Sequence, residues 1–214
     1  MIIDCISDLH GNYPNLEGGD LLIIAGDLTA TDEIEQYEEF QRWIEVQNYK
    51  MKIIVAGNHD NEIEKGLDLH CPNLGIHYLC DSGTEFQGLK IWGSPWTKTF
   101  PDMNPSCKAF TCDTEEELTV YFELIPADID ILITHSPPYG ILDECSNGHV
   151  GSKSLFSFIK YVFRPYLHVF GHIHESYGQI EEFACRDDKY MKSVNASHVN
   201  RYYQPVNKPI RVIL

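Results

Sequence analysis

The sequence predicts an α/β protein, and three observations support this expectation. Five short apolar runs are continuous rather than alternating, which is typical of strands buried on both faces of a sheet. Segments with the apolar spacing of helices lie between several of these runs. Each of the five runs is followed within a few residues by polar side chains, as expected where the carboxyl ends of strands form a binding site.

The five predicted strands are residues 2–6, 21–25, 53–56, 131–134 and 167–170. Further β structure is expected in the segment 76–96 and near the C-terminus, at residues 177–180, 189–194 and 210–214. The parallel arrangement predicted for the apolar runs would bring their carboxyl ends to one edge.

Three helices are expected between the strands. From residue 31 to residue 48, apolar side chains recur at spacings of three and four: Ile34, Tyr37, Phe40 and Ile44. Thr114 and Glu117 form a capping box that predicts a second helix start. Ser152 is the expected N-cap of a third helix, whose buried face would carry Leu155, Phe156, Ile159 and Val162.

Composition excludes several classes of protein. The 214 residues fit one domain over 1–214, since ~100–200 residues per domain is typical. With 16 Lys and Arg against 32 Asp and Glu, the formal net charge is -16, which disfavours bulk binding to nucleic acid or to anionic membranes. No apolar run approaches ~18 residues, and no signal peptide is evident. Seven scattered cysteines without a C-x-x-C pair favour reduced thiols, so we expect a cytoplasmic protein; the oligomeric state is not predicted.

The polar residues after the five strands share one chemistry, that of ligands for divalent metal ions. They are Asp8, His10, Asp27, Asn58, His135, His172 and His174. Carboxylate, amide and imidazole donors suit Mn²⁺, Fe²⁺ or Zn²⁺, and the absence of cysteine from the set argues against a structural zinc site.

Seven ligands are too many for one tetrahedral ion, so the sequence predicts two ions that share Asp27. Asp8, His10 and His174 would complete the first site. Asn58, His135 and His172 would complete the second. Paired ions ~3.5–4 Å apart are a recurrent device for phosphoryl chemistry, because they hold a bridging hydroxide as nucleophile and neutralise phosphate oxygens.

Three more residues have candidate roles. His59 follows Asn58 directly and is not needed by either ion, so it is the candidate general acid that protonates a departing oxygen. The amide of Asn12 is a candidate contact for a substrate phosphate. The ring of Trp96 is a candidate surface on which a nucleobase could stack. For Trp96 the alternative is core packing at a turn. His168, inside an apolar run, is expected to be a hydrogen-bonded core residue.

Each motif alone is weak, since a Gly-Asp pair after a strand is usually only a turn. Together and in this order, the five resemble the calcineurin-like metallophosphoesterase superfamily, whose pattern is D-x-H … G-D … G-N-H-[DE] … H … G-H-x-H. Here the pattern is met by residues 8–10, 26–27, 57–60, 135 and 171–174. The resemblance implies a four-layer α/β/β/α sandwich with a dinuclear metal site on a loop-lined rim, and the same seven ligands.

Finer features are similar to the MPPED-type subfamily of metallophosphoesterases. They lie in residues 91–96, 131–138, 164–165, 168–175, 195–197 and 205–210. Some members of that subfamily carry Gly in place of the first His of G-H-x-H and are weak catalysts that bind nucleoside monophosphates. This chain has His172 there, which implies a complete second metal site.

One departure bears on substrate class. Protein phosphatases of the superfamily have G-D-x-x-D, whose second Asp orients the catalytic histidine, whereas Ala30 stands at that place here. Asp32 and Asp60 are the candidate substitutes. This departure and the acidic surface favour a phosphodiesterase over a protein phosphatase. The resemblance to the MPPED-type subfamily implies cyclic nucleotides, so we expect a phosphodiesterase acting on cyclic nucleotides or other small phosphodiesters. The alternatives are a nucleotide-binding or scaffold protein with little turnover, and a phosphomonoesterase or protein phosphatase.

Overall fold

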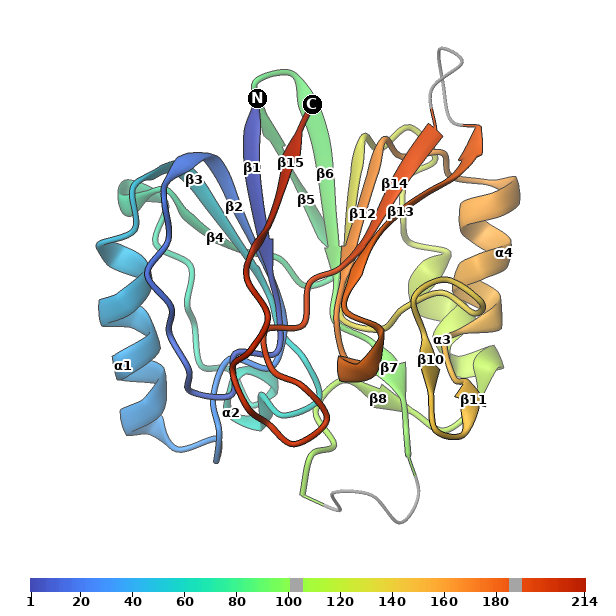
Figure 1. Ribbon diagram of the computed structural model, residues 1–214. Helices are drawn as coiled ribbons and strands as arrows, with labels where there is room; N and C mark the ends of the chain where they lie inside the picture. The colour runs from blue at the N-terminus through green and yellow to red at the C-terminus, as the bar shows by residue number, and fades with distance from the viewer. Residues whose placement is uncertain (101–105, 185–189) are drawn as a thin grey trace.

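Two β-sheets lie face to face and carry helices on both outer sides, so that the chain forms four layers (Figure 1). The computed structural model describes residues 1–100, 106–184 and 190–214. Residue 189 of the strand expected over 189–194, and Cys185, lie outside the described residues. The expected α/β/β/α sandwich is confirmed.

The first sheet has the strand order β15-β1-β2-β3-β4. Its strands are β1 (Ile2–Ile6), β2 (Gly19–Ala25), β3 (Tyr49–Val55), β4 (Ile76–Tyr78) and β15 (Ile210–Ile213). β1 to β4 are parallel, whereas β15 returns from the far end of the chain and pairs antiparallel with β1.

The second sheet has the order β13-β14-β12-β9-β6-β5. Its strands are β5 (Ser82–Phe86), β6 (Leu89–Ser94), β9 (Ile131–Thr134), β12 (Leu167–Phe170), β13 (Gly178–Ala184) and β14 (Tyr190–Asn195). The four central strands are parallel, and β5 and β13 close the two edges antiparallel.

Helices and short elements fill the connections. The α-helices are α1 (Ile34–Glu45), α2 (Asn61–Glu64), α3 (Glu115–Phe122) and α4 (Lys153–Tyr161), and the 3₁₀ helices are η1 (Pro72–Leu74) and η2 (His174–Ser176). The short strand pairs are β7 (Thr97–Lys98) with β8 (Thr111–Cys112), and β10 (Glu144–Cys145) with β11 (Gly148–His149).

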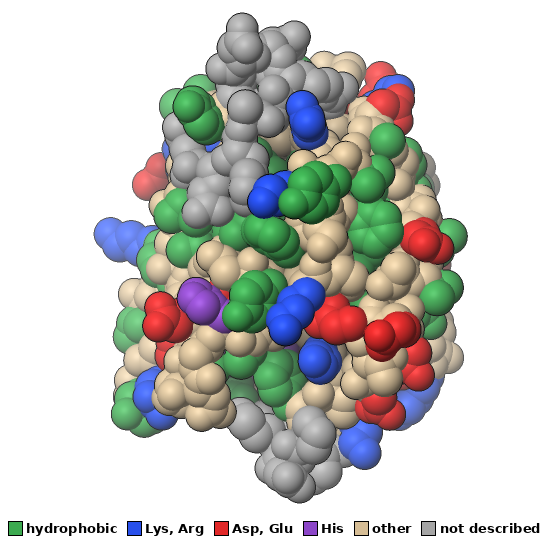
Figure 2. All heavy atoms as spheres, turned by 90° about the vertical axis from the view of Figure 1, so that its right-hand side faces the viewer, with side chains coloured by type: hydrophobic (Ala, Val, Ile, Leu, Met, Phe, Trp, Pro, Cys, Tyr) green, Lys and Arg blue, Asp and Glu red, His purple; other side chains and the backbone are tan. Residues whose placement is uncertain are grey.

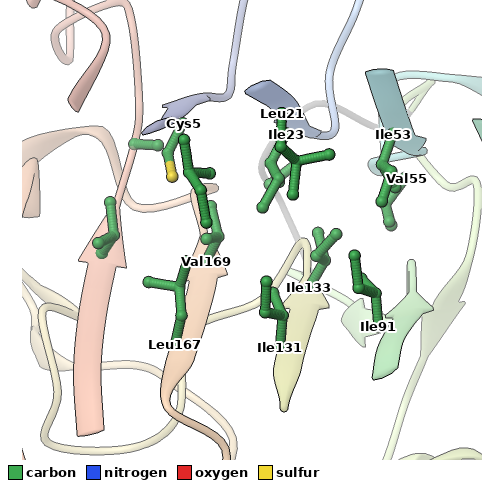
Figure 3. Close-up of a cluster of buried hydrophobic side chains, with 14 of the residues drawn as sticks. Cys5, Leu21, Ile23, Ile53, Val55, Ile91, Ile131, Ile133, Leu167 and Val169 are labelled. Atoms are coloured by element: carbon green, nitrogen blue, oxygen red, sulfur yellow. The ribbon is translucent and has the colours of Figure 1, made fainter. Parts of the chain in front are cut away.

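The inner core explains the continuous apolar runs. Alternate residues of each strand point between the sheets, where Leu21 and Ile23 of β2 face Ile131 and Ile133 of β9 (Figure 3). The residues between them, such as Ile24, point outward into a second cluster beneath α1. Because both faces of these strands are covered, neither face can be polar.

The predicted helices are present, with differences in their buried faces. Tyr37, Phe40 and Ile44 of α1 are buried, but Ile34 at its first turn is exposed. In α4, Leu155 and Ile159 are buried, whereas Phe156 is only half-buried and Val162 is exposed. Both exposed residues lie at helix ends, where the apolar stripe has already passed the edge of the sheet.

The caps of α3 and α4 are linked. The Thr114–Glu117 capping box is formed, and Ser152 accepts a hydrogen bond from the Leu155 amide, as predicted. Glu115 also accepts hydrogen bonds from the amide and the hydroxyl of Ser154. The negative charge of the Glu115 carboxylate interacts favourably with the positive, N-terminal end of the α4 dipole. The acidic first turn of α3 therefore stabilises the neighbouring helix.

No helix among the described residues is long and apolar enough to cross a membrane. On the face over α3 and α4, acidic, basic and hydrophobic side chains are interspersed, as is usual for a solvated surface (Figure 2). The cysteines that the structure describes are unpaired.

The carboxyl ends of β1, β2 and β3 in one sheet and of β9 and β12 in the other lie along the lower edge of the sandwich in Figure 1. The loops that follow these five strands therefore meet across the gap between the two sheets.

Candidate metal centre

Four of the seven predicted ligands have a backbone conformation that is rare outside glycine. The φ angles are 51° at Asp8, 42° at His10, 55° at Asp27 and 68° at His172. Such left-handed conformations cluster at functional sites, because the surrounding structure must enforce them. Here each one turns the chain at a strand end so that its side chain points to a common centre.

The first group of donors forms around Asp8. Its Oδ1 lies 3.2 Å from His174 Nε2, and His174 Nε2 lies 3.4 Å from His10 Nε2. Asp8, His10 and His174 offer ligand atoms within 4.8 Å of one another. The Gly-His-Ile-His segment leaves β12 and bends into η2, which begins at His174. An extended segment would direct His172 and His174 to opposite sides, so this bend is needed for both to reach the site.

The second group forms around His135. Its Nε2 lies 3.0 Å from Asn58 Oδ1, and its ring centroid lies 4.9 Å from that of His172. Nε2 of His172 is buried and has no hydrogen-bond partner among the described residues. A buried imidazole nitrogen without a partner is costly, and a bound cation would satisfy it.

Asp27 lies between the two groups. Its Oδ2 is 3.6 Å from His10 Nε2, and its Oδ1 is 3.4 Å from His135 Nε2. The two oxygens of one carboxylate thus face different donor groups. This arrangement fits one carboxylate that bridges two divalent ions.

Hydrogen bonds behind the ligands hold them in place. His135 Nδ1 donates to the carbonyl of Ala25 at 2.8 Å, which leaves Nε2 available to a metal. Ser197 Oγ donates to Asp8 Oδ2 at 2.8 Å, and also to the fully buried Asn195. Because Asn195 is fully buried, its Asn-x-Ser sequence cannot carry a glycan in the folded protein.

Asp60 ties two of the motifs together. Its carboxylate accepts hydrogen bonds from the amides of Asp27, Leu28 and Gly57 at 2.7–3.0 Å. It is fully buried, and burial together with the charge of Asp27 raises its pKa to about 7. Asp60 therefore supports the loops and does not contact His59. Asp32 instead accepts hydrogen bonds from Tyr37 and Asn61.

The ligand histidines differ in pKa. Burial lowers the pKa of His10 to about 4 and that of His172 to about 3, so both are neutral near pH 7 and ready to bind a metal. Burial alone would lower the pKa of His135, but the Asp27 carboxylate outweighs it and raises the pKa to about 9. Burial alone would also lower the pKa of His174, but the hydrogen bond to Asp8 and the Asp8 charge outweigh it and raise the pKa.

Converging oxygen and nitrogen donors, a carboxylate that faces two donor groups and an unpartnered buried imidazole fit a divalent metal centre. A sequence model of the calcineurin-like phosphoesterase family matches residues 1–176, which include all five motifs. The chain belongs to the calcineurin-like metallophosphoesterases. It is accordingly a metal-dependent phosphoric ester hydrolase.

Relatives and structures agree with this family. The metallophosphoesterase is 33% identical to human Metallophosphoesterase domain-containing protein 1 over 238 residues, which cover 98% of this chain and 70% of that protein. It is 30% identical to UPF0046 protein T07D4.2 of Caenorhabditis elegans, over 96% of this chain and 58% of that protein. The structure of Phosphopantetheinyl Hydrolase from Mycobacterium tuberculosis has the same fold, with a TM-score of 0.58, 16% identity and coverage of 99% and 95% of the two chains.

The candidate acid His59 lies at this metal centre. Its Nε2 is 3.9 Å from Asp27 Oδ2, and its ring centroid is 4.6 Å from that of His10. Its Nδ1 faces Cys107 Sγ at 3.3 Å. The histidine therefore lies directly at the site. Together with His10 and Asp27 it offers ligand atoms within 4.8 Å of one another, although neither predicted ion needs it.

The two candidate substrate contacts do not face the site. Trp96 stacks on Tyr121 with ring centroids 3.6 Å apart and donates its indole N–H to Asp81. The amide of Asn12 donates to the carbonyls of Leu9 and His10 at 3.1 Å. Core packing for Trp96 and a turn for Asn12 account for these contacts, and the geometry does not support a substrate contact at either.

His168 is a core residue as predicted. It is fully buried, and its Nε2 lies 2.8 Å from Thr134 Oγ1. Burial lowers its pKa to about 3, so it is neutral.

A cavity of about 690 Å³ opens beside the metal donors. Its lining adds residues that the motifs did not indicate: Lys98, Phe100, Lys108, Arg201 and Tyr203. The Tyr203 ring packs 4.8 Å from that of His10 and 5.3 Å from that of His174, and its φ of 59° is unusual for so bulky a residue. The loop carrying Arg201 and Tyr203 had no local sequence pattern, so only the structure reveals it.

We expect two metal ions per chain in metal-reconstituted wild-type protein, counted by elemental analysis after removal of free metal. Asn58→Ala removes a donor of the second group and should leave close to one ion at the same metal concentration. Asn147→Ala is the matched control, since Asn147 lines the same cavity and is not a predicted ligand. One ion in the wild type, or two in Asn58→Ala, would contradict the partition of ligands.

Metal binding should release protons near neutral pH. With a pKa of about 9, His135 carries a proton in the metal-free protein at pH 7.5, and binding through Nε2 displaces about one proton. The raised pKa also stabilises the metal-free fold below pH ~6.5, and this contribution is lost as the pH rises to ~9.

Calorimetric titrations in buffers of different ionisation enthalpy measure this release. The apparent metal affinity should rise from pH 7 to 9, and the dependence of the binding enthalpy on the buffer should shrink by pH 9.5. An enthalpy independent of the buffer at pH 7.5 would show that His135 is not protonated there.

Proposed function

We propose that this metallophosphoesterase is a phosphodiesterase that acts on cyclic nucleotides or other small phosphodiesters, with two Mn²⁺ ions as the preferred metals. The observation that carries the proposal is the placement of His59 and a small-molecule cavity beside two donor groups that share Asp27.

The cavity supports a small substrate. Its volume of about 690 Å³ lies within the ~300–1,000 Å³ typical of small-molecule sites. Lys98, Lys108 and Arg201 line it and offer cationic groups to an anionic substrate. The acidic side chains of Asp113 and Glu175 line the same cavity. Among the described residues, the side chains of Lys98 and Lys108 form no ion pair. Phe100 and Tyr203 add aromatic surface for the organic part of the substrate.

The chain's own residues divide the chemistry. Bound divalent ions supply activation of water and neutralisation of phosphate charge. Asp8, Asp27 and the histidines around them would hold those ions, because their ligand atoms already lie, in groups of three, within 4.8 Å of one another. His59 presents Nε2 at the edge of the donor groups, where it can give a proton to a departing oxygen.

A substrate panel tests the proposal. Metal-free protein is reconstituted separately with Mn²⁺, Zn²⁺ or Fe²⁺ and assayed on bis(p-nitrophenyl) phosphate, p-nitrophenyl phosphate, 3′,5′-cyclic AMP and a phosphopeptide. His135→Ala, purified identically, reports contaminating activity. We expect the highest kcat/KM on diesters, with Mn²⁺, and background rates for His135→Ala.

Other outcomes favour the alternatives. Faster turnover of the monoester or the phosphopeptide would favour a phosphomonoesterase or a protein phosphatase. Tight binding of nucleoside monophosphates without turnover of any ester would favour the nucleotide-binding protein. We also propose a reducing, cytoplasmic setting, which the unpaired cysteines support.

A further inference from the structure

His59 has a polar neighbour on the side of its ring that faces away from Asp27. Sγ of Cys107 lies 3.3 Å from His59 Nδ1, and Nε2 lies 3.9 Å from Asp27 Oδ2. Among the described residues, the hydrogen-bond partner of Nδ1 is Cys107. The ring is thus oriented by contacts at its two nitrogens, one to a thiol and one to the carboxylate shared by the donor groups.

Two backbone anchors fix the position of Cys107. On one side of it, Asn61 Nδ2 donates to the carbonyl of Ser106 at 3.1 Å. On the other side, the amide of Ala109 donates to the carbonyl of Asn58 at 3.2 Å. Both anchors lie in the segment 58–61 that contains His59. The thiol and the imidazole are therefore held by one hydrogen-bonded unit.

The usual carboxylate partners do not contact His59. Ala30 stands where protein phosphatases have the second Asp, and Asp32 and Asp60 bind other groups. A thiol can serve in place of a carboxylate, because it donates weakly to an unprotonated nitrogen and accepts weakly from an N–H. Burial raises the pKa of Cys107, which keeps the thiol protonated and adds no negative charge beside the metal donors.

We propose that Cys107 is the positioning residue for His59, and that its thiol holds the imidazole with Nε2 directed toward the scissile phosphoester. The proposal rests on the proposed function for its catalytic consequence, but the contact itself is independent of turnover. Cys107 acts through His59 and makes no contact with the reacting atoms.

The contact is tested first without activity. In metal-free protein, the ¹⁵N chemical shifts of the His59 ring are compared between the wild type and Cys107→Ala at one pH. Cys145→Ala is the matched control, because Cys145 is also half-buried and lines the same cavity. We expect the Nδ1 shift of His59 to move in Cys107→Ala alone. No change in Cys107→Ala, or an equal change in both variants, would overturn the proposal.

The catalytic consequence is tested by a double-mutant cycle on a diester with an alcohol leaving group and on one with a nitrophenolate leaving group. Cys107→Ala should lower kcat about 3- to 10-fold on the alcohol ester, with little change in KM and little effect on the nitrophenyl ester. Cys107→Ser keeps a donor and acceptor and should recover most of the loss. In the His59→Ala background, Cys107→Ala should have no further effect.

The outcomes separate the two proposals. Wild-type protein that cleaves no phosphodiester would contradict the proposed function, while the ¹⁵N shifts would still decide whether Cys107 orients His59. Equal losses on the two esters, or a full loss from Cys107→Ala that persists without His59, would overturn the positioning role. Metal content must match the wild type in every variant compared.

Discussion

His59→Ala should lose ~10²–10⁴-fold in kcat on a phosphodiester whose leaving group is an alcohol, and far less on a nitrophenyl ester. The alcohol leaves as a strongly basic oxygen that needs a proton, and general acid catalysis is typically worth this factor. Nitrophenolate departs without a proton, so the same substitution removes little. The imidazole lies beside the shared carboxylate, with Nε2 3.9 Å from Asp27 Oδ2, and is not one of the seven predicted ligands.

Steady-state rates on the two esters in metal-loaded protein measure this difference. Because His59 follows the predicted ligand Asn58, elemental analysis must show that His59→Ala keeps its full metal content. His77→Ala is a histidine control away from the site. Equal losses on the two esters would show that His59 packs the loop or binds the phosphate and is not an acid.

Gly171→Ala should disable the first metal group and destabilise the protein. Gly171 approaches Asp8 so closely that an added Cβ would lie 2.1 Å from Asp8 Oδ2 and 2.1 Å from Ser7 Oγ. Both neighbours are fully buried, so neither can move aside cheaply. Overpacking of this kind costs roughly 1–3 kcal/mol, and displacement of a ligand or its support lowers metal affinity or activity roughly 10- to 100-fold.

Chemical denaturation of the metal-free protein and metal titration of the same variant measure the two effects separately. Gly140→Ala is the control, since its φ of +81° carries the usual strain of a substitution but its Cβ would meet nothing within 4 Å. Gly171→Ala with wild-type metal affinity would show that Asp8 is not held by this contact.

Local patterns were enough for much of the fold. The run 21–25 predicted a strand buried on two faces, and its residues do alternate between the inner core and the layer beneath α1. The capping box at Thr114 and the cap at Ser152 involve neighbours in sequence, so the residues themselves specify them. Val162 was assigned to the buried face of its helix wrongly, and Ile34, which belongs to the apolar spacing of α1, is exposed, because periodicity does not say where a helix passes the edge of a sheet.

The functional site, too, was predicted only in part from the sequence. The residue types after the strands indicated seven candidate ligands, and the structure brings them to one place. Trp96, beside a Gly-Ser-Pro turn, was a candidate for stacking on a nucleobase with core packing as the alternative, and in the structure Tyr121 covers its ring and Asp81 binds its indole. Whether an aromatic side chain in such a turn faces a ligand or the core depends on how the turn packs in the folded chain.

The sequence by itself determined the strands, the helix starts and the chemical type of each candidate ligand, because these depend on neighbours along the chain. Only the tertiary structure decided the contacts that complete the site. Ser197 supports Asp8 from 189 residues away, Cys107 faces His59 from 48 residues away, and β15 joins the first sheet beside β1. Such pairs form because the two sheets pack with their strand ends along one edge, and no local pattern records which distant side chains that packing brings together.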